Sequence, residues 1–475
     1  MSWSVKKYFS SLLPTESHER TKWLLMSVTF FLIIAAYTIA KELKDSIFVA
    51  IVGDRQYIFW AKLFSIGILI PAVLLYSKLV DSLKRYRLLS FYCFLYGVVG
   101  LLFAFLLGHP TIGLPNTNAS SYRIFGWLFY FFIEGYAPFV VSVFWSFANS
   151  ITSPEGAKKN YGFMVAGSKL GGMLSAAFAY LLLTLPDTEW FALSGTAKHQ
   201  LLLAVASLCL MLAPLVIYML MKKVSGRYLH GYEAVYKVEK KRSKEGKVKT
   251  GVFSGLVMLI RTPYVFGIFY LGMCYELIYS VLSYQRVGIA QEGGASTVEV
   301  STYFFKIILL THALGFLISL FGTRSLLKRL GEKRCLILIP IAIAFLFAYF
   351  KFSNSSKGAF AVFFVLMRAI HYGFSYPIRE SLYIPTVKEL KFKTKSWIDA
   401  FGTKFSKLNG WLFNYITTGL TVGGFAAAQG IFFGGVLTLW ILVSWLLGNR
   451  FEKAIKNKEV IGLNGASDGE GIASK

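Results

Sequence analysis

Twelve apolar runs, separated by short polar connections, follow one another along the chain. A helix needs about 20 apolar residues to cross the hydrocarbon layer of a bilayer, and most of these runs have about that length. We therefore expect an all-α membrane protein with about 12 transmembrane helices. The runs lie at 23–51, 57–79, 88–108, 122–149, 160–184, 199–221, 262–285, 301–322, 334–350, 359–385, 400–425 and 427–448.

Composition supports a membrane protein, and the motifs of the chain do not favour an enzyme. The 475 residues are 55% hydrophobic and only 16% charged, whereas a soluble domain carries about 25% charged residues. Each of the four cysteines (Cys93, Cys209, Cys274 and Cys335) falls in a different run. They have neither disulfide nor metal-site spacing, so we expect small core residues. No HExxH motif occurs, and we expect no catalytic site, cofactor or metal.

The charge of the connections predicts the orientation in the membrane. A formal net charge of +26 on a soluble protein would suggest nucleic-acid binding. Here the basic residues lie mainly in alternate connections, so we expect no nucleic-acid partner. By the positive-inside rule these connections and both termini are cytoplasmic, which requires an even number of spans. The basic connections are 82–87, 157–159, 222–249, 324–334 and 388–395.

The longest basic connection divides the chain into two halves of six spans, an arrangement typical of major-facilitator transporters. We expect this linker to be solvated and attracted to anionic lipid, with a regulatory or nucleic-acid role as the alternative. The polar C-terminal tail is expected to be disordered. The sequence does not fix the oligomeric state, and a monomer is compatible with it. The predicted domains are a cytoplasmic N-terminus (1–22), a first bundle (23–221), the linker (222–250), a second bundle (251–448) and a cytoplasmic tail (449–475).

Ionisable residues inside the apolar runs point to the function. Each costs about 2.5–3.5 kcal/mol at membrane depth, so such residues usually line a polar cavity. Glu134 lies about ten residues from either end of its run, and Lys44, Glu276 and Lys407 lie in three other runs. Together with the further basic residues in the runs, they carry more positive than negative charge, which favours a pathway for an anion.

Structural roles remain open for these residues. Lys41 and Lys44 share one helix face and could extend to the interface, or Lys44 could meet a phosphate as a point charge. Glu134 could pair with a lysine across the bundle, gate the substrate or accept a proton. Lys404 and Lys407 could also lie at the interface. They share a helix face with Trp411 and Asn414, a pattern that resembles a phosphate site beside an aromatic ring that stacks a base.

Three further basic residues are secondary candidates. Lys169 lies among small residues from Gly167 to Gly172 that allow close helix packing. The GxxxxGK[ST] spacing of a phosphate loop is absent there, which argues against an ATPase. Lys306 is expected to be buried, as is His312, either as a core pair or as functional groups. Arg379 lies at the mouth of the tenth run.

Four sequence blocks resemble the bacterial and plastid nucleotide transporters of the ATP/ADP translocase type. Tyr37–Asp45 is similar to the family's Y-T-I-L-R-x-x-K-D, and Glu134 precedes a Val141–Thr152 segment similar to its S-V-L-F-W-x-F-A-N-x-I-T. The second functional glutamate of the family falls on Glu276. The most specific block runs from Pro377 to Lys407 and is similar to P-x-K-E-M-A-Y-I-P followed by K-x-K-G-K-A-A-I-D and a lysine.

The resemblance implies a secondary transporter in the inner membrane of an obligate intracellular bacterium. It would import host ATP in exchange for ADP by alternating access. Lys44 and Lys407 would hold phosphate oxygens, while Glu134 and Glu276 would pair with those lysines in the empty carrier. The lysines that usually follow the second glutamate are absent, and Gly135 and Tyr136 replace a Leu-Trp pair.

These departures leave two alternatives. One is proton-coupled uptake of other nucleotides or NAD by a divergent member of the family. The other, from a different class, is a major-facilitator carrier of another organic anion.

Overall fold

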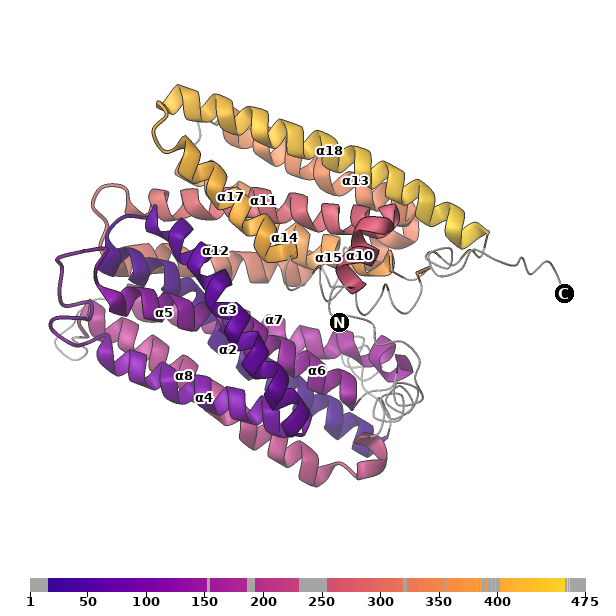
Figure 1. Cartoon of the computed structure of the whole chain (residues 1–475), viewed down its shortest axis with the longest axis horizontal. Coiled ribbons are helices and arrows are strands. Elements are labelled where there is room, and N and C mark those ends of the chain that lie inside the picture. The colour runs from indigo at the N-terminus through magenta and orange to yellow at the C-terminus, as the bar shows by residue number, and fades with distance from the viewer. Residues whose placement is uncertain are drawn as a thin grey trace, which may run out of the picture. The chain divides into compact units, whose positions relative to one another are not determined.

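The structure is a computed structural model of the chain, shown in Figure 1. It describes residues 16–151, 154–185, 193–229, 254–318, 323–353, 356–383, 385–386 and 402–457, together with 390, 394, 398, 459 and 461. Most of the predicted linker, from residue 230 to 250, and most of the predicted tail lie outside the described residues, as do residues 1–15 of the predicted N-terminus.

Helices account for all twelve predicted runs, which confirms the all-α prediction. Among the described residues, ten helical segments are long and apolar enough to cross a membrane. The two remaining predicted runs correspond to α3, whose described apolar part is Tyr57–Leu69, and to the short helix α17. The first six runs form α2 (Ser17–Val52), α3 (Tyr57–Ser82), α4 (Arg85–Leu106), α5 (Ile124–Glu134) with η1 (Ala137–Val141) and α6 (Ser142–Ser150), α7 (Pro154–Thr184) and α8 (Gly195–Lys223).

The last six runs are preceded by the short helices η2 (Gly226–Leu229) and α10 (Ser254–Arg261). Helix α13 contains a break at Gly331, whose φ of 75° is readily adopted by glycine. The six runs form α11 (Pro263–Gln291), α12 (Thr297–Leu317), α13 (Thr323–Phe352), α14 (Lys357–Ile370) with η4 (His371–Ser375) and α15 (Tyr376–Ser381), α17 (Thr403–Thr417) and α18 (Val422–Lys456).

Two spans contain a π-helical turn next to a proline. Pro138 lies inside η1, and Pro377 is the second residue after η4. Proline has no backbone N–H to donate, so it disturbs the regular ladder of a helix, and wider π turns of this kind often occur at functional sites. Glu134 lies three residues before η1, and Arg368 lies three residues before η4. The fourth and tenth predicted spans therefore share both an irregular turn and a charged residue just before it.

Glycines bring α7 close to α2, in agreement with the close packing predicted around Lys169. A Cβ atom on Gly171 would lie 2.5 Å from the carbonyl oxygen of Phe31 and 3.1 Å from its Cα. Backbone atoms cannot move away as easily as a flexible side chain, so the two helices need this glycine. The contact fixes the position of α2, the helix that carries Lys44.

Replacing Gly171 by alanine is expected to lower the free energy of unfolding by about 1–3 kcal/mol, because the added methyl group overfills the contact. The measurement is the thermal unfolding midpoint of the purified protein in detergent, which should fall by a few degrees. The matched control is Gly434→Ala on α18, where an added Cβ meets nothing within 4 Å. The helix preference of alanine should leave that variant unchanged or slightly stabilised. Equal effects of the two substitutions would contradict the packing argument.

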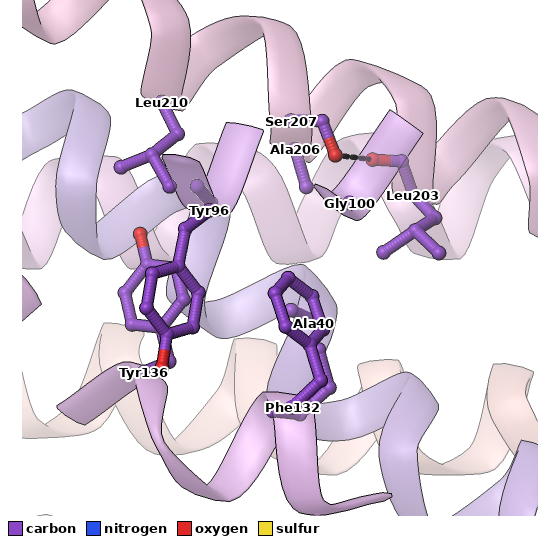
Figure 2. A pocket seen from close by; sticks show the side chains of 11 residues that line it. Ala40, Tyr96, Gly100, Phe132, Tyr136, Leu203, Ala206, Ser207 and Leu210 are labelled. Carbon is purple, nitrogen blue, oxygen red and sulfur yellow. Dashed lines mark hydrogen bonds between the residues drawn. The ribbon is translucent and has the colours of Figure 1, made fainter. Parts of the chain in front are cut away.

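Aromatic rings and small residues fill the interior between α2, α4, α5 and α8. Figure 2 shows Tyr96, Phe132 and Tyr136 converging near Ala40 and Gly100. The gap they leave is only about 10 Å³, hardly enough for one water molecule. Tyr136 donates a hydrogen bond of 2.9 Å to the carbonyl of Ile33. This region is therefore packed core and offers no room for a substrate.

The chain forms two compact units. The first contains Met1–Val248 and also Arg286–His312, which is the end of α11 and most of α12. The second contains Lys249–Gln285 and Ala313–Lys475. The division after Val248 falls within the linker predicted at 222–250. The domain boundaries at 23–221 and 251–448 remain predictions.

Candidate functional site

A lysine–glutamate pair lies inside the first unit. Lys44 of α2 donates a hydrogen bond from Nζ to Oε1 of Glu134, the last residue of α5. The side chains are 6% and 20% exposed. The amine also lies 4.1 Å from the centre of the Tyr130 ring, whose negative face attracts a cation. A second amine, Nζ of Lys62 on α3, lies 3.8 Å from the same glutamate oxygen.

Other charged residues extend this cluster along α2. Asp45 Oδ1 lies 3.5 Å from Lys44 Nζ, and Asp45 Oδ2 lies 4.0 Å from Nη2 of Arg286. Arg286 in turn donates a hydrogen bond of 2.6 Å to Glu42 Oε2. The three basic and three acidic side chains of the cluster balance one another, which limits the cost of placing them at membrane depth.

A hollow of about 220 Å³ adjoins Glu134. Its wall includes Ser65 and Leu69 of α3, and the rings of Tyr96 and Phe132. The Glu134 carboxylate therefore lies close to the amines of Lys44 and Lys62 and also borders an open, mainly apolar space. The π turn η1 begins three residues after Glu134 and interrupts the regular helix at this wall.

The second unit contains another lysine–glutamate pair. Nζ of Lys407, on α17, lies 3.7 Å from Oε2 of Glu276, on α11. The Lys407 side chain is 36% exposed and that of Glu276 is 17% exposed, so this pair is more open to solvent than the first. Oε2 of Glu276 accepts no hydrogen bond from the described residues. A longer and wetter ion pair is weaker, so Lys407 can leave Glu276 at low cost.

Aromatic side chains surround Glu276 and its neighbours. The Tyr275 ring stacks on His371 with 3.3 Å between ring centres and an angle of 4°. Arg368 is buried, and its guanidinium lies 5.3 Å from the centre of the Tyr279 ring and 5.8 Å from that of Tyr372. Helix α11, which carries Glu276, thus also contacts a buried arginine.

The other predicted basic residues have varied environments. The amine of Lys41 lies 5.7 Å from the centre of the Tyr37 ring. Lys169 and Lys404 are half-buried. Arg379 packs against Gly272 of α11 and lies 5.2 Å from the Tyr376 ring centre. Their roles toward a substrate remain predictions.

One prediction of burial is wrong. Lys306 is exposed, because its neighbours Phe304, Phe305 and Ile307 occupy the buried sides of α12. His312 is half-buried and packs against Gly172 of α7.

Trp411 and Asn414, which share the predicted helix face of Lys404 and Lys407, serve as packing groups in this conformation. Trp411 is 2% exposed, and its ring meets Tyr284 edge-on at 5.2 Å. The amide nitrogen of Asn414 donates hydrogen bonds to the carbonyls of Gly410 and Val281, at 3.0 and 3.4 Å. Stacking of Trp411 on a base remains a prediction.

Sequence analysis missed four charged residues that lie in the charged cluster of the first unit or against the rings of α11, namely Glu42, Lys62, Arg286 and Arg368. Three of them fall inside predicted runs, so the criterion that selected Glu134 could also have found them. Arg286 lies one residue beyond the run predicted at 262–285, although helix α11 continues to Gln291.

Comparison with known families decides the class of protein. A model described as TLC ATP/ADP transporter matches residues 2–451. The chain belongs to the TLC ATP/ADP transporter family. The resemblance noted from the four sequence blocks is thereby confirmed, and the protein is a transporter.

Carrier proteins of Rickettsia and Chlamydia are similar to this chain. The "ADP,ATP carrier protein 3" of Rickettsia felis is 24% identical over 449 residues, which cover 84% of this chain and 87% of the relative. The "ADP,ATP carrier protein 1" of Chlamydia trachomatis is 23% identical and covers 95% of this chain and 93% of its own length. At this identity the chain is a divergent TLC transporter.

Solved structures confirm the major-facilitator-like fold of this TLC transporter. The xylose transporter XylE of E. coli superposes with a TM-score of 0.58 at 14% identity and covers 94% of this chain and 99% of its own. FucP, a Major Facilitator Superfamily transporter, gives a TM-score of 0.54 at 15% identity, with 91% and 99% covered. At these identities the likeness concerns the fold alone. Membership of the family, together with ten described helices long and apolar enough to cross a membrane, makes this TLC transporter a multi-pass membrane protein.

Proposed function

We propose that this transporter exchanges ATP for ADP across the inner membrane of a bacterium, with both termini in the cytoplasm. The observation that carries the proposal is a lysine–glutamate pair inside each unit, Lys44 with Glu134 and Lys407 with Glu276. Membership of the TLC family and the names of the Rickettsia and Chlamydia relatives support a nucleotide as the substrate.

The pairs suggest how phosphate is recognised. A lysine without a counter-charge at membrane depth costs about 2.5–3.5 kcal/mol. In the empty carrier Glu134 removes that cost for Lys44, and a phosphate oxygen takes its place when the nucleotide binds. The amine is then neutralised in both states. A nucleoside carries no charge to replace the carboxylate, so it is excluded.

The test is uptake by bacterial cells that express the chain, with a panel of labelled nucleotides and unlabelled competitors. We expect ATP uptake that rises with ADP inside the cells, falls with added ATP or ADP, and ignores adenosine and protonophores. Uptake that does not depend on internal ADP and stops when a protonophore is added would indicate proton-coupled symport and not exchange. No uptake of any nucleotide would refute the proposal.

Replacing Glu134 by glutamine is expected to tighten nucleotide binding by about 5- to 30-fold, since about 1–2 kcal/mol of competition for Lys44 disappears. The exchange rate should fall at the same time, because the substrate leaves more slowly. Titration calorimetry of the purified protein with ATP measures the first effect. Glu452→Gln, which removes an exposed carboxylate from the end of α18, is the matched control and should bind as the parent does. Weaker binding by Glu134→Gln would show that the carboxylate does not compete with phosphate.

A further inference from the structure

The pair of Arg286 and Glu42 has no role in the proposed phosphate site. It joins the end of α11 to the C-terminal part of α2 by a hydrogen bond of 2.6 Å, and the side chains are 3% and 1% exposed. The guanidinium also lies 4.1 Å from the centre of the Phe304 ring on α12. The pair therefore ties the segment Arg286–His312 to α2 inside the first unit.

Asp45 lies between this pair and the phosphate site. Its two oxygens face different cations, Lys44 at 3.5 Å and Arg286 at 4.0 Å. Both distances are too long for hydrogen bonds, and Oδ1 accepts none from the described residues. A buried carboxylate held in this way gains from any donor that approaches it.

Six charges consequently alternate in sign along one line of contacts. The line runs Lys62, Glu134, Lys44, Asp45, Arg286 and Glu42. The terminal phosphate of ADP or ATP carries more negative charge than the Glu134 carboxylate that it displaces, so it outweighs the positive charge that Asp45 faces at Lys44. Arg286 is then the cation left to neutralise Asp45.

We propose that Arg286 is a coupling residue of the exchange and moves from Glu42 to Asp45 when a phosphate occupies Lys44. The inference rests on the function proposed above for Lys44. Glu42 and Asp45 lie three residues apart on α2, and therefore about one helical turn apart on the same face. One-turn shifts of this size, about 5 Å, are a known way for packed elements to switch between two arrangements.

A second set of contacts indicates which buried residue becomes exposed when Arg286 moves. Ser301 of α12 donates a hydrogen bond of 2.9 Å to Oγ of Ser46, and Nε2 of His199 lies 2.8 Å from Ser301 Oγ. These buried groups hold the same segment to α2 and α8. Movement of Arg286 along α2 separates Ser301 from Ser46, so that Ser46 becomes accessible from the side opposite the basic connections.

The experiment follows the accessibility of position 46. A Ser46→Cys reporter is placed in a chain from which the four native cysteines have been removed, and a membrane-impermeant methanethiosulfonate is added outside the cells. We expect slow labelling without nucleotide, and at least fivefold faster labelling with ADP. Glu42→Gln should give the fast rate without nucleotide, because Arg286 is released. Asp45→Asn should keep the slow rate with ADP present.

Transport measurements distinguish a coupling role of Asp45 from a general effect of its substitution on the structure. Asp45→Asn should lower the maximal exchange rate by tenfold or more, while the affinity for ADP changes by less than about threefold. The matched control is Glu19→Gln, which removes the 2.8 Å ion pair with Lys22 at the other end of α2. Its labelling should be slow and should respond to ADP as in the parent.

Two results would overturn the inference. They are slow, ADP-responsive labelling in Glu42→Gln, or a parental response to ADP in Asp45→Asn. If the single variants do not reach the membrane, the charge-reversed pair Glu42→Arg with Arg286→Glu decides instead, since it should restore slow labelling. If the parent exchanges no nucleotide, the proposed function fails. The comparison of Glu42→Gln with the parent, which needs no nucleotide, then still tests the tie between Arg286 and Glu42.

Discussion

Replacing Lys44 by glutamine is expected to lower nucleotide exchange by about 10- to 150-fold. A hydrogen bond to a charged group contributes about 1.5–3 kcal/mol, and each 1.4 kcal/mol corresponds to a factor of ten. The amide of glutamine can still donate a hydrogen bond but brings no charge to a phosphate. Lys62, 3.8 Å from Glu134, remains to neutralise the carboxylate, so the variant should fold and reach the membrane.

Initial rates of labelled ATP uptake into cells preloaded with ADP measure this effect, after correction for the amount of protein in the membrane. Lys41→Gln is the matched control, because its amine faces the Tyr37 ring one turn away on the same helix. It should lose clearly less activity, less than about fivefold. Lys44→Arg keeps the charge and should recover part of the rate. If exchange by Lys44→Gln matched that of the parent, the phosphate role of Lys44 would be excluded.

Lys407→Gln is expected to lower exchange by about 10- to 50-fold without a change in thermal stability. Its pair with Glu276 is 3.7 Å long and the lysine is 36% exposed, and exposed ion pairs contribute only about 0–1 kcal/mol to folding. The loss should therefore lie in substrate binding, and the KM for ATP should rise more than the maximal rate falls.

Two measurements distinguish a loss of substrate binding from a loss of stability. They are the unfolding midpoint in detergent and the concentration dependence of ATP uptake, both on the same preparation. Lys404→Gln, three residues earlier on α17, serves as the comparison and should raise the KM less. A fall in the unfolding midpoint of Lys407→Gln that accounts for its lost activity would assign the lysine to the fold and not to the substrate.

The apolar runs predict the spans well because lipid imposes one simple rule, a length of continuous apolar helix. They predict the ends less well. Helix α11 extends six residues beyond the predicted end at 285, and α18 begins at Val422, five residues before the predicted start. Hydropathy detects the apolar core of a helix, whereas backbone hydrogen bonds continue into its polar ends.

The candidate site could be predicted in part. The cost of charge in lipid singles out Glu134, Lys44, Glu276 and Lys407. Which lysine pairs with which glutamate depends on distances in the folded protein, which the structure supplies. Burial depends on neighbours that pattern alone does not place. Lys306 lies on the exposed side of α12, whereas Arg368 is buried among aromatic rings. Glu42 was missed because charges on both sides made it resemble the polar end of a helix.

The distance along the chain between Glu42 and Arg286 has a consequence for biosynthesis. The arginine follows its carboxylate partner by 244 residues, so the ribosome completes the first six spans before this cation exists. Until α11 emerges, the first helix carries a carboxylate that lipid alone cannot accommodate cheaply. In the finished protein the guanidinium of Arg286 donates a hydrogen bond to this carboxylate, so the arrival of α11 lowers the cost of holding the first helix in the bilayer.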